Sequence, residues 1–275
     1  MRKMTWSNIF SVVIAIMAMA AAGKSLYQPG FYSNTDTNFL RLVANQDLVI
    51  LAIFVPLLLI STWLASHNNF RGTLAWLGAV GYLSYVYCGY AFGGVSVKLF
   101  LLHIAIAALS SFLLSAKLAT INHEAIRLRF TPVTSFGFTA FFMIMVALLV
   151  EVLWLQGLIP IFRKTIIELP FLSLNSFLAV QVLDLAFLGP LCLLAGFWLY
   201  FQKAVGYVFT AMLLVIIPAK FGTMVTDFNL ILNLQQTNLI FSILTLVALV
   251  LLIYFLKKLK EEKLTSYYNR ISGSY

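Results

Sequence analysis

Residues 182–194 read VLDLAFLGPLCLL, an apolar run that contains one ionisable side chain, Asp184, and a Gly189-Pro190 pair within two helical turns of it. A charge and a proline are both costly inside an apolar helix, because the charge loses its hydration and proline removes a backbone hydrogen bond. The apolar character extends over residues 177–200, which is long enough to cross the hydrocarbon core of a bilayer. The stretch therefore predicts a membrane-spanning helix that carries its acid for a functional or structural reason.

The whole chain has the composition of a membrane protein. Of its 275 residues, 62% are hydrophobic and 10% are charged, far outside the range of soluble domains. An outer-membrane barrel would instead show strands of about ten residues with alternating polarity. We predict an all-α polytopic bundle of about eight transmembrane helices, forming a single integral membrane domain over residues 1–275. The apolar runs lie near 5–23, 47–66, 73–92, 98–118, 137–156, 177–200, 204–224 and 237–256.

The first run has a second interpretation. The basic start MRK and the small residues AMAAAG also fit a secretory signal peptide with its cleavage site. We favour a retained helix, and the other seven helices keep the same orientation in either case.

The Lys and Arg residues predict that both termini are cytoplasmic. With the N-terminus inside and alternating helices, the cytoplasmic side receives two thirds of the basic residues, as the positive-inside rule requires. The inner set is Arg2, Lys3, Arg71, Lys117, Arg127, Arg129, Lys203, Lys257, Lys258, Lys260, Lys263 and Arg270, and the outer set is Lys24, Arg41, Lys98, Arg163, Lys164 and Lys220. Residues 257–275 form a basic cytoplasmic tail. The net charge of +9 then reflects topology and an anionic inner leaflet, and no nucleic-acid partner is needed.

Two of the predicted helices resemble each other. Residues 47–63 (DLVILAIFVPLLLISTW) and 184–198 (DLAFLGPLCLLAGFW) both begin with Asp-Leu, contain Pro-Leu and end at a Trp. They are the second and the sixth helix, four positions apart, so the similarity predicts two parallel four-helix halves related by an axis along the membrane normal. The spacing from Asp to Pro differs, being nine residues in one helix and six in the other.

The ionisable groups inside the predicted spans lie in the outer half or near the midplane. A charge at the bilayer centre costs about 2.5 to 3.5 kcal/mol on insertion scales, so each such group is expected to face the protein interior with a partner or a role. Asp184 lies deepest, and the others are Asp47, His103, Glu151 and Lys220.

Four tyrosines in YLSYVYCGYAF add hydroxyl groups at the same depth. We expect Tyr87 and Tyr90 to belong to the outer aromatic belt. Tyr82 and Tyr85 lie deeper and on nearly one face, so their hydroxyls need acceptors such as Asp184 or Asp47.

Three prolines are expected to break helices at depth: Pro56, Pro190 and Pro218. Pro190 cannot donate to the carbonyl of Ala186, and interrupted helices at mid-depth form the binding sites of many transporters. Asp184, Gln181 and the freed carbonyl could therefore form a small cation or proton site. The alternative is a structural Asp184 that bonds to a tyrosine or pairs with Lys220.

Several chemistries are not supported. The three histidines fall on both sides of the membrane, with His67 and His123 inside, so they predict no metal site and no haem. Cys88 and Cys192 lie in apolar runs and are expected to be packing residues. No nucleotide-binding, metalloprotease or serine-hydrolase motif is present, and no cofactor is predicted. Nothing in the sequence brings Glu151 and Asp184 together as an acid/base pair.

Four segments of the chain share a resemblance: GFYSNTDTNFLRLVANQDLVILAIFVPLLLISTWLA, RGTLAWLGAVGYLSYVYCGYAFG, LDLAFLGPLCLLAGFWL and GYVFTAMLLV. They resemble an uncharacterised family of bacterial multi-pass integral membrane proteins with no established activity. The resemblance spans most of residues 30–215. It implies a bacterial cytoplasmic (inner) membrane and no mechanism. An Asn is expected among the tyrosines in that family, where Val86 stands here.

Three functions remain open. The first is binding or transport of a small solute or cation through an outward-facing polar pocket; the second is a non-catalytic membrane partner or assembly subunit; the third is a membrane enzyme that acts on a lipid or quinone headgroup. The first requires Asp184 to line a cavity, whereas a dry and paired Asp184 favours the second. The expected pocket residues are Asp184, Gln181, Asp47, Tyr82, Tyr85, His103, Glu151 and Lys220.

Overall fold

The chain folds into a bundle of long helices. The computed structural model describes residues 6–28, 37–130, 136–162, 174–232 and 235–260, and within these ranges no β-strand occurs. Seven of the described helical segments are long and apolar enough to cross a membrane. The predicted all-α polytopic bundle is confirmed, and the chain is a multi-pass membrane protein.

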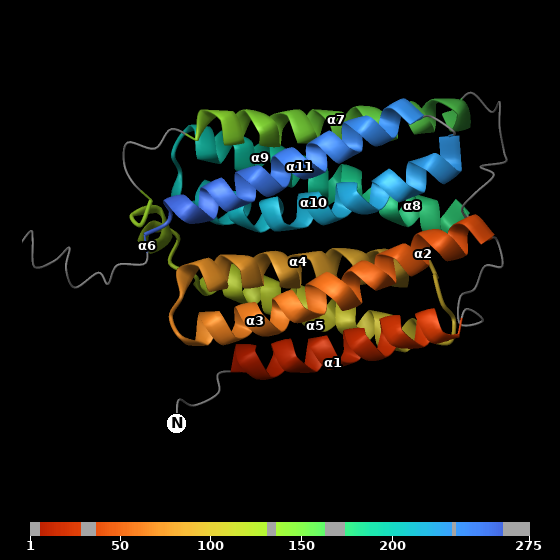
Figure 1. Ribbon diagram of the computed structural model, residues 1–275, viewed down its shortest axis with the longest axis horizontal. Coiled ribbons are helices and arrows are strands. Elements are labelled where there is room, and N and C mark those ends of the chain that lie inside the picture. The colour runs from red at the N-terminus through yellow and green to blue at the C-terminus, as the bar shows by residue number, and fades with distance from the viewer. Residues whose placement is uncertain (1–5, 29–36, 131–135, 163–173, 233–234, 261–275) are drawn as a thin grey trace, which may run out of the picture.

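The helices divide into two groups along the chain. The first group is α1 (Trp6–Tyr27), α2 (Thr37–Val49), η2 (Ile50–Phe54), α3 (Val55–Ser66), α4 (Phe70–Phe92) and α5 (Phe100–Thr120). After the short α6 (His123–Arg127), the second group is α7 (Gly137–Phe162), α8 (Leu174–Leu183), η3 (Asp184–Leu188), α9 (Gly189–Tyr200), α10 (Ala204–Leu232) and α11 (Gln235–Lys258). Figure 1 shows the first group below the second, with the start of α1 and the end of α11 at the same end of the bundle.

The two groups are structural repeats in one register. Pro190 follows Pro56 by 134 residues, and Ala204, the first residue of α10, follows Phe70, the first residue of α4, by the same 134. In each group a five-residue π-helix immediately precedes a twelve-residue α-helix with proline in its first turn. The left-handed residues after these helices, Asn68 and Gln202, are again 134 apart.

This register corrects the equivalence expected from the sequence. At a spacing of 134 residues, Asp184 corresponds to Ile50, and Asp47 corresponds to Gln181. The two Asp-Leu pairs are therefore not equivalent positions. The similarity of two leucine-rich helices was real, but their prolines and not their acids mark the shared register.

The repeats meet along α4 and α10. Gly78 lies so close to Val215 that a methyl group on Gly78 would collide with the valine side chain, and a methyl group on Gly81 would come within 3.2 Å of Ile216. Small residues allow this close approach of helices in membranes. α4 is not among the seven apolar segments, although it has 23 residues, and more than half of these are buried. Because α4 faces protein on most sides, it does not need an apolar surface for lipid.

Several helices extend farther than the apolar runs indicated, at the end of the bundle that was predicted to be the outer one. α2 begins at Thr37 rather than at residue 47, α7 continues to Phe162 and α10 continues to Leu232. At α2 the extension is polar, and hydropathy does not detect polar turns beyond the hydrocarbon core. At α7 the extension over residues 157–162 reads GLIPIF, where Gly157 and Pro160 favour a helix end that does not occur. Much of the basic tail, and the basic residues Arg163 and Lys164, lie outside the described residues.

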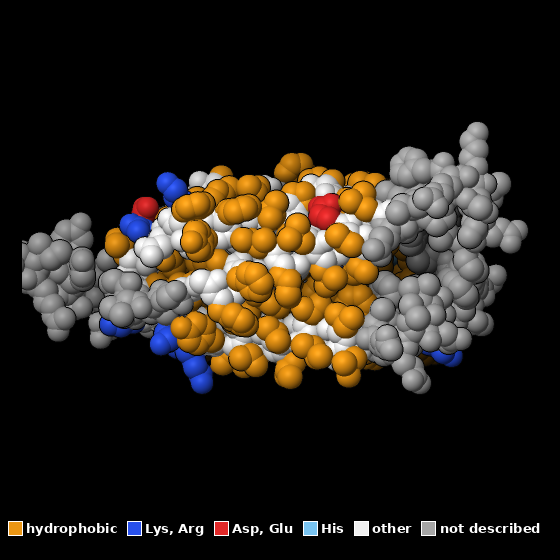
Figure 2. Space-filling model, turned by 90° about the horizontal axis from the view of Figure 1, so that it is seen from above, with side chains coloured by type: hydrophobic (Ala, Val, Ile, Leu, Met, Phe, Trp, Pro, Cys, Tyr) orange, Lys and Arg blue, Asp and Glu red, His pale blue; other side chains and the backbone are white. Residues whose placement is uncertain are grey.

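The other end of the bundle is closed by α6 and the end of α11. The Arg71 guanidinium donates to the carbonyl of Leu259 at 2.7 Å, and Lys260 N donates to the carbonyl of Arg129 at 3.0 Å. Figure 2 shows most of the blue basic side chains gathered toward this end, beyond the orange hydrophobic surface. The distribution of the described basic residues thus follows the predicted inner side.

Candidate functional site

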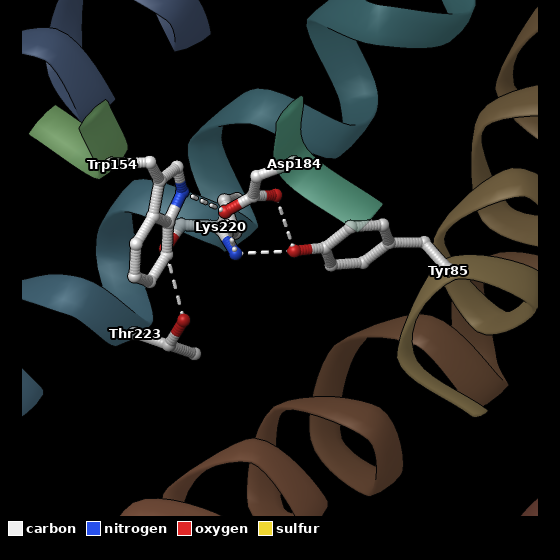
Figure 3. Close-up of polar contacts among 5 residues, drawn as sticks. All are labelled: Tyr85, Trp154, Asp184, Lys220 and Thr223. Atoms are coloured by element: carbon white, nitrogen blue, oxygen red, sulfur yellow. Dashed lines mark hydrogen bonds and ion pairs between the residues drawn. The ribbon is translucent and has the colours of Figure 1, made fainter. Parts of the chain in front are cut away.

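Asp184 is the centre of a polar cluster in the interior of the bundle. Its side chain is fully buried, at 0% exposure, and it is the first residue of the π-helix η3. The Tyr85 hydroxyl donates to Oδ1 at 2.6 Å, and the Trp154 indole donates from Nε1 to Oδ2 at 2.7 Å. The Lys220 ammonium lies 2.9 Å from Oδ2 (Figure 3). Both carboxylate oxygens are therefore occupied by groups of the protein itself.

Lys220 completes the cluster. Its ammonium also donates to the Tyr85 hydroxyl and lies 4.8 Å from the centre of that ring. The Lys220 side chain is only 9% exposed, so its charge is neutralised by Asp184 rather than by water. Thr223, one turn later in α10, donates to the Lys220 carbonyl at 2.9 Å. The sequence-based alternative of an Asp184 bonded to a tyrosine and paired with Lys220 is confirmed.

The cluster joins the two repeats. Tyr85 belongs to α4 in the first repeat, whereas Asp184 and Lys220 belong to η3 and α10 in the second (Figure 3). At the equivalent positions the first repeat has Ile50 and Val86, both buried. The second repeat thus supplies the ion pair, and the first supplies the hydroxyl that contacts both charges. The helices of the two repeats correspond, but the residues of this cluster do not.

Gln181 connects to this cluster through Trp154. Its Nε2 donates to the Trp154 carbonyl at 3.1 Å, and its side chain is 2% exposed. Within the described part of the chain its Oε1 has no hydrogen-bond donor. A buried acceptor without a donor is energetically costly, so this oxygen is a position where a water or a small solute would be stabilised.

Asp47 lies in a second cluster. The Tyr90 hydroxyl donates to Asp47 Oδ1 at 3.1 Å, and the Tyr90 ring lies 5.3 Å from the ring of His103. The Tyr87 ring is 5.7 Å from His103, and the Tyr87 hydroxyl donates to the Ala18 carbonyl at 3.3 Å. These contacts tie α1, α2, α4 and α5 together within the first repeat.

This cluster corrects the expected position of two tyrosines. Tyr87 is 0% exposed and Tyr90 is 8% exposed, so neither belongs to an aromatic belt at the membrane surface. The prediction was wrong because depth along a helix does not reveal which of its faces meets lipid. α4 is surrounded by other helices, so its tyrosines find acceptors inside the protein.

Tyr82 has a third set of partners. Its hydroxyl accepts a hydrogen bond from the Gln46 amide, and its ring stacks on Phe54 with centroids 3.6 Å apart. Tyr82 is thus held within the first repeat, whereas Tyr85, one turn later, reaches Asp184. The eight expected pocket residues therefore fall into separate groups of contacts: Asp184, Tyr85, Lys220 and Gln181 belong together, Asp47 and His103 belong to a second cluster, and Tyr82 is held by Gln46 and Phe54.

Glu151 is not part of either cluster. It lies in α7, three residues before Trp154, and its side chain is partly exposed. Its Oε1 faces the backbone of Gly189, where a methyl group would collide with it. No acid/base pair of Glu151 with Asp184 is formed, since Asp184 uses both of its oxygens within its own cluster.

The prolines act differently from one another. Pro56 and Pro190 each lie just after a π-helix. In a π-helix the backbone N–H donates to the carbonyl five residues earlier instead of four, as Gly189 N does to the Asp184 carbonyl. Pro218 lies inside α10, which stays α-helical on both sides, so the expected break at Pro218 is absent. Ala186 is exposed while Asp184 is fully buried, and the contacts of the Asp184 carboxylate are instead made by Tyr85, Trp154 and Lys220.

Sequence reasoning missed Trp154 and Gln46, which hold two of the predicted residues. The indole N–H of a tryptophan within a membrane span needs an acceptor, and this rule could have pointed to Trp154. Gln46 directly precedes the predicted run 47–66, whereas the helix begins at Thr37, so Gln46 lies inside a helix that the sequence did not predict there.

A groove of about 440 Å³ lies elsewhere, between α1 and α5. Trp6, Phe10, Phe112 and Lys117 are among its lining residues, and none of the predicted pocket residues is. No group of three or more metal-binding side chains is present among the described residues. Comparisons with protein-family models, with curated proteins and with solved structures found no match.

Proposed function

We propose that the chain is a non-catalytic membrane partner or assembly subunit whose buried polar clusters fix the packing of its two repeats. The observation that supports this proposal is the state of Asp184, which is fully buried and has both oxygens bonded to Tyr85, Trp154 and Lys220. A buried and paired acid favours the subunit function, whereas a ligand pocket requires Asp184 to line a cavity.

The physical role of the cluster is to specify one arrangement of the repeats. A buried ion pair adds little net stability over a well-packed apolar contact, but a misplaced repeat would leave both charges without partners in a low-dielectric interior. The Tyr85 hydroxyl of the first repeat is hydrogen-bonded to both members of that pair. Helix packing in membranes lacks a hydrophobic driving force, so such polar contacts carry more of the specificity.

The proposal places the chain in a bacterial cytoplasmic membrane, with both termini in the cytoplasm. The positive-inside bias and the resemblance to a bacterial membrane family support this placement. The partner of such a subunit would be another membrane protein.

A second candidate function is binding or transport of a small solute or cation between the repeats. Two observations favour it. The segments that precede the two π-helices reach the opposite repeat, since α8 packs against α4 and α2 packs against α10. The Gln181 Oε1 acceptor has no donor among the described residues. In this function a cation would have to replace the Lys220 ammonium beside Asp184.

One experiment separates the two functions. Wild type, Asp184→Asn and the control Glu124→Gln, which removes an exposed acid, are purified in detergent and heated with a panel of ions and small solutes at several pH values. A subunit with a structural Asp184 gives the same ligand-induced shifts in melting temperature for all three proteins. A shift that is present in wild type and Glu124→Gln but lost in Asp184→Asn overturns the proposal and assigns the ligand to Asp184.

A further inference from the structure

Glu151 is an acid on an apolar surface of the bundle. It lies in the span that begins at Gly137, and its neighbours on α7 are the exposed side chains Leu148, Val152 and Leu155, at 56%, 49% and 53% exposure. Phe187 of η3, two residues before the Gly189 that Glu151 touches, is 63% exposed. We call Leu148, Glu151, Val152, Leu155 and Phe187 the Glu151 face. Figure 2 shows an acidic side chain set among hydrophobic ones on one face of the bundle.

Glu151 differs from the other acids that the structure describes. Asp47 bonds to Tyr90, Glu124 pairs with Arg127, and Asp184 pairs with Lys220. Within the described residues no hydrogen bond or ion pair reaches the Glu151 carboxylate. It is a partly exposed acid in a membrane span, and no cationic side chain among the described residues pairs with it.

The carboxylate points toward the membrane centre. Glu151 lies 14 residues after the inner end of α7, about 21 Å along the helix, and its Oε1 touches Gly189, which lies about 16 Å from the inner end of α9 at Tyr200. Side chains of a helix tilt toward its N-terminus, which is the inner end of α7. The carboxylate is thereby directed away from the nearer end of α7 and toward Gly189.

The chemistry of this face favours one kind of occupant. A membrane segment must satisfy its backbone internally, so the occupant is an α-helix. A Lys or Arg side chain at mid-depth would neutralise Glu151, while leucine-like side chains would pack on the surrounding apolar residues. A second copy of this chain offers no such group on its described lipid-facing surface, and a symmetric contact would bring two Glu151 carboxylates together.

We propose that the Glu151 face docks a transmembrane helix of a different protein that carries a cationic side chain near its midpoint. This inference rests on the proposed function as a membrane partner. It assigns the docking face and the charge of the partner.

The test uses the full chain in proteoliposomes with synthetic transmembrane peptides. Three Leu-Ala host peptides carry Lys, Leu or Glu at the central position, and association is measured by energy transfer between a donor on the protein and an acceptor on the peptide. Wild type is expected to bind the Lys peptide at least tenfold more tightly than the Leu peptide, and the Glu peptide no better than the Leu peptide. Glu151→Leu is expected to abolish the Lys preference, and the control Glu124→Gln is expected to keep it.

Equal association of wild type with all three peptides overturns the inference, as does a Lys preference that persists in Glu151→Leu. Self-association of wild type that Glu151→Leu disrupts also overturns it, in favour of a second copy. The peptide test and the ligand-shift test at Asp184 can be told apart. If Glu151→Leu loses the Lys preference of wild type and no ligand shift depends on Asp184, both proposals are supported. If a ligand shift depends on Asp184, the subunit function is overturned, whatever the peptides show.

Discussion

The Lys220 ammonium lies 2.9 Å from Oδ2 of Asp184 in the interior of the bundle, with Tyr85 of the other repeat in contact with both. The two charges come from different helices, α10 and η3, and neither has appreciable exposure to solvent or lipid. Removing one of them leaves the other buried and unpaired. This relationship makes the ion pair a sensitive point for stability.

Asp184→Asn is expected to lower the free energy of unfolding by about 3 to 5 kcal/mol, because Lys220 is left without its counter-charge. Lys220→Met is expected to destabilise by a similar amount. The double variant is expected to be more stable than either single variant, since no charge is then buried. Thermal unfolding of the four proteins in detergent measures the coupling, and additive losses would contradict a direct ion pair.

Tyr85→Phe is expected to cost about 1 to 3 kcal/mol, because Asp184 Oδ1 loses its donor in a buried site. Tyr200→Phe is the matched control, since Tyr200 is 65% exposed, and it is expected to leave the melting temperature unchanged. An equal effect of the two substitutions would show that the Tyr85 hydroxyl does not contribute to holding the repeats together.

Gly78→Ala and Gly23→Ala are expected to have opposite effects. A methyl group on Gly78 collides with Val215 and forces α4 from α10, at a cost of about 1 to 3 kcal/mol. Nothing lies within 4 Å of the equivalent methyl group on Gly23, so alanine there is expected to stabilise α1 by about 0.5 to 1 kcal/mol. Melting temperatures of the two variants test the close approach of the repeats.

Cysteine labelling is expected to report the orientation. In a background with Cys88 and Cys192 replaced by alanine, Lys24→Cys lies at the outer end of α1 and Lys203→Cys lies in the turn before α10. A membrane-impermeant maleimide added to intact spheroplasts is expected to label only Lys24→Cys, and to label Lys203→Cys after permeabilisation. The reverse pattern would place the termini outside.

The helix bundle could be predicted because membrane insertion imposes a simple rule on the sequence. Apolar runs of about 20 residues are needed wherever a helix faces hydrocarbon, and such runs are visible one at a time. The prediction failed at one end each of α2, α7 and α10, where the helix continues beyond the apolar run. It also misjudged Tyr87 and Tyr90, because their helix is enclosed by others.

The polar cluster could be predicted only in part. Asp184, Lys220 and Tyr85 were recognisable as groups that need partners, and their mutual contacts satisfy that need. Trp154 and Gln46 were not recognised, and Glu151 was expected inside. Burial in a membrane protein cannot be read from hydropathy, since lipid-facing and core-facing side chains are equally apolar.

The sequence by itself determined the class of the protein, the approximate positions of its seven long apolar spans, and the set of groups that are costly in a membrane. Each of these depends on the transfer of single residues or single helices from water to lipid, which is a local property. The tertiary structure decided the register of 134 residues between the repeats, the sharing of Asp184 and Lys220 with Tyr85, and the outward position of Glu151. These depend on how helices rotate and pack against one another, and packing is determined by all of the helices together.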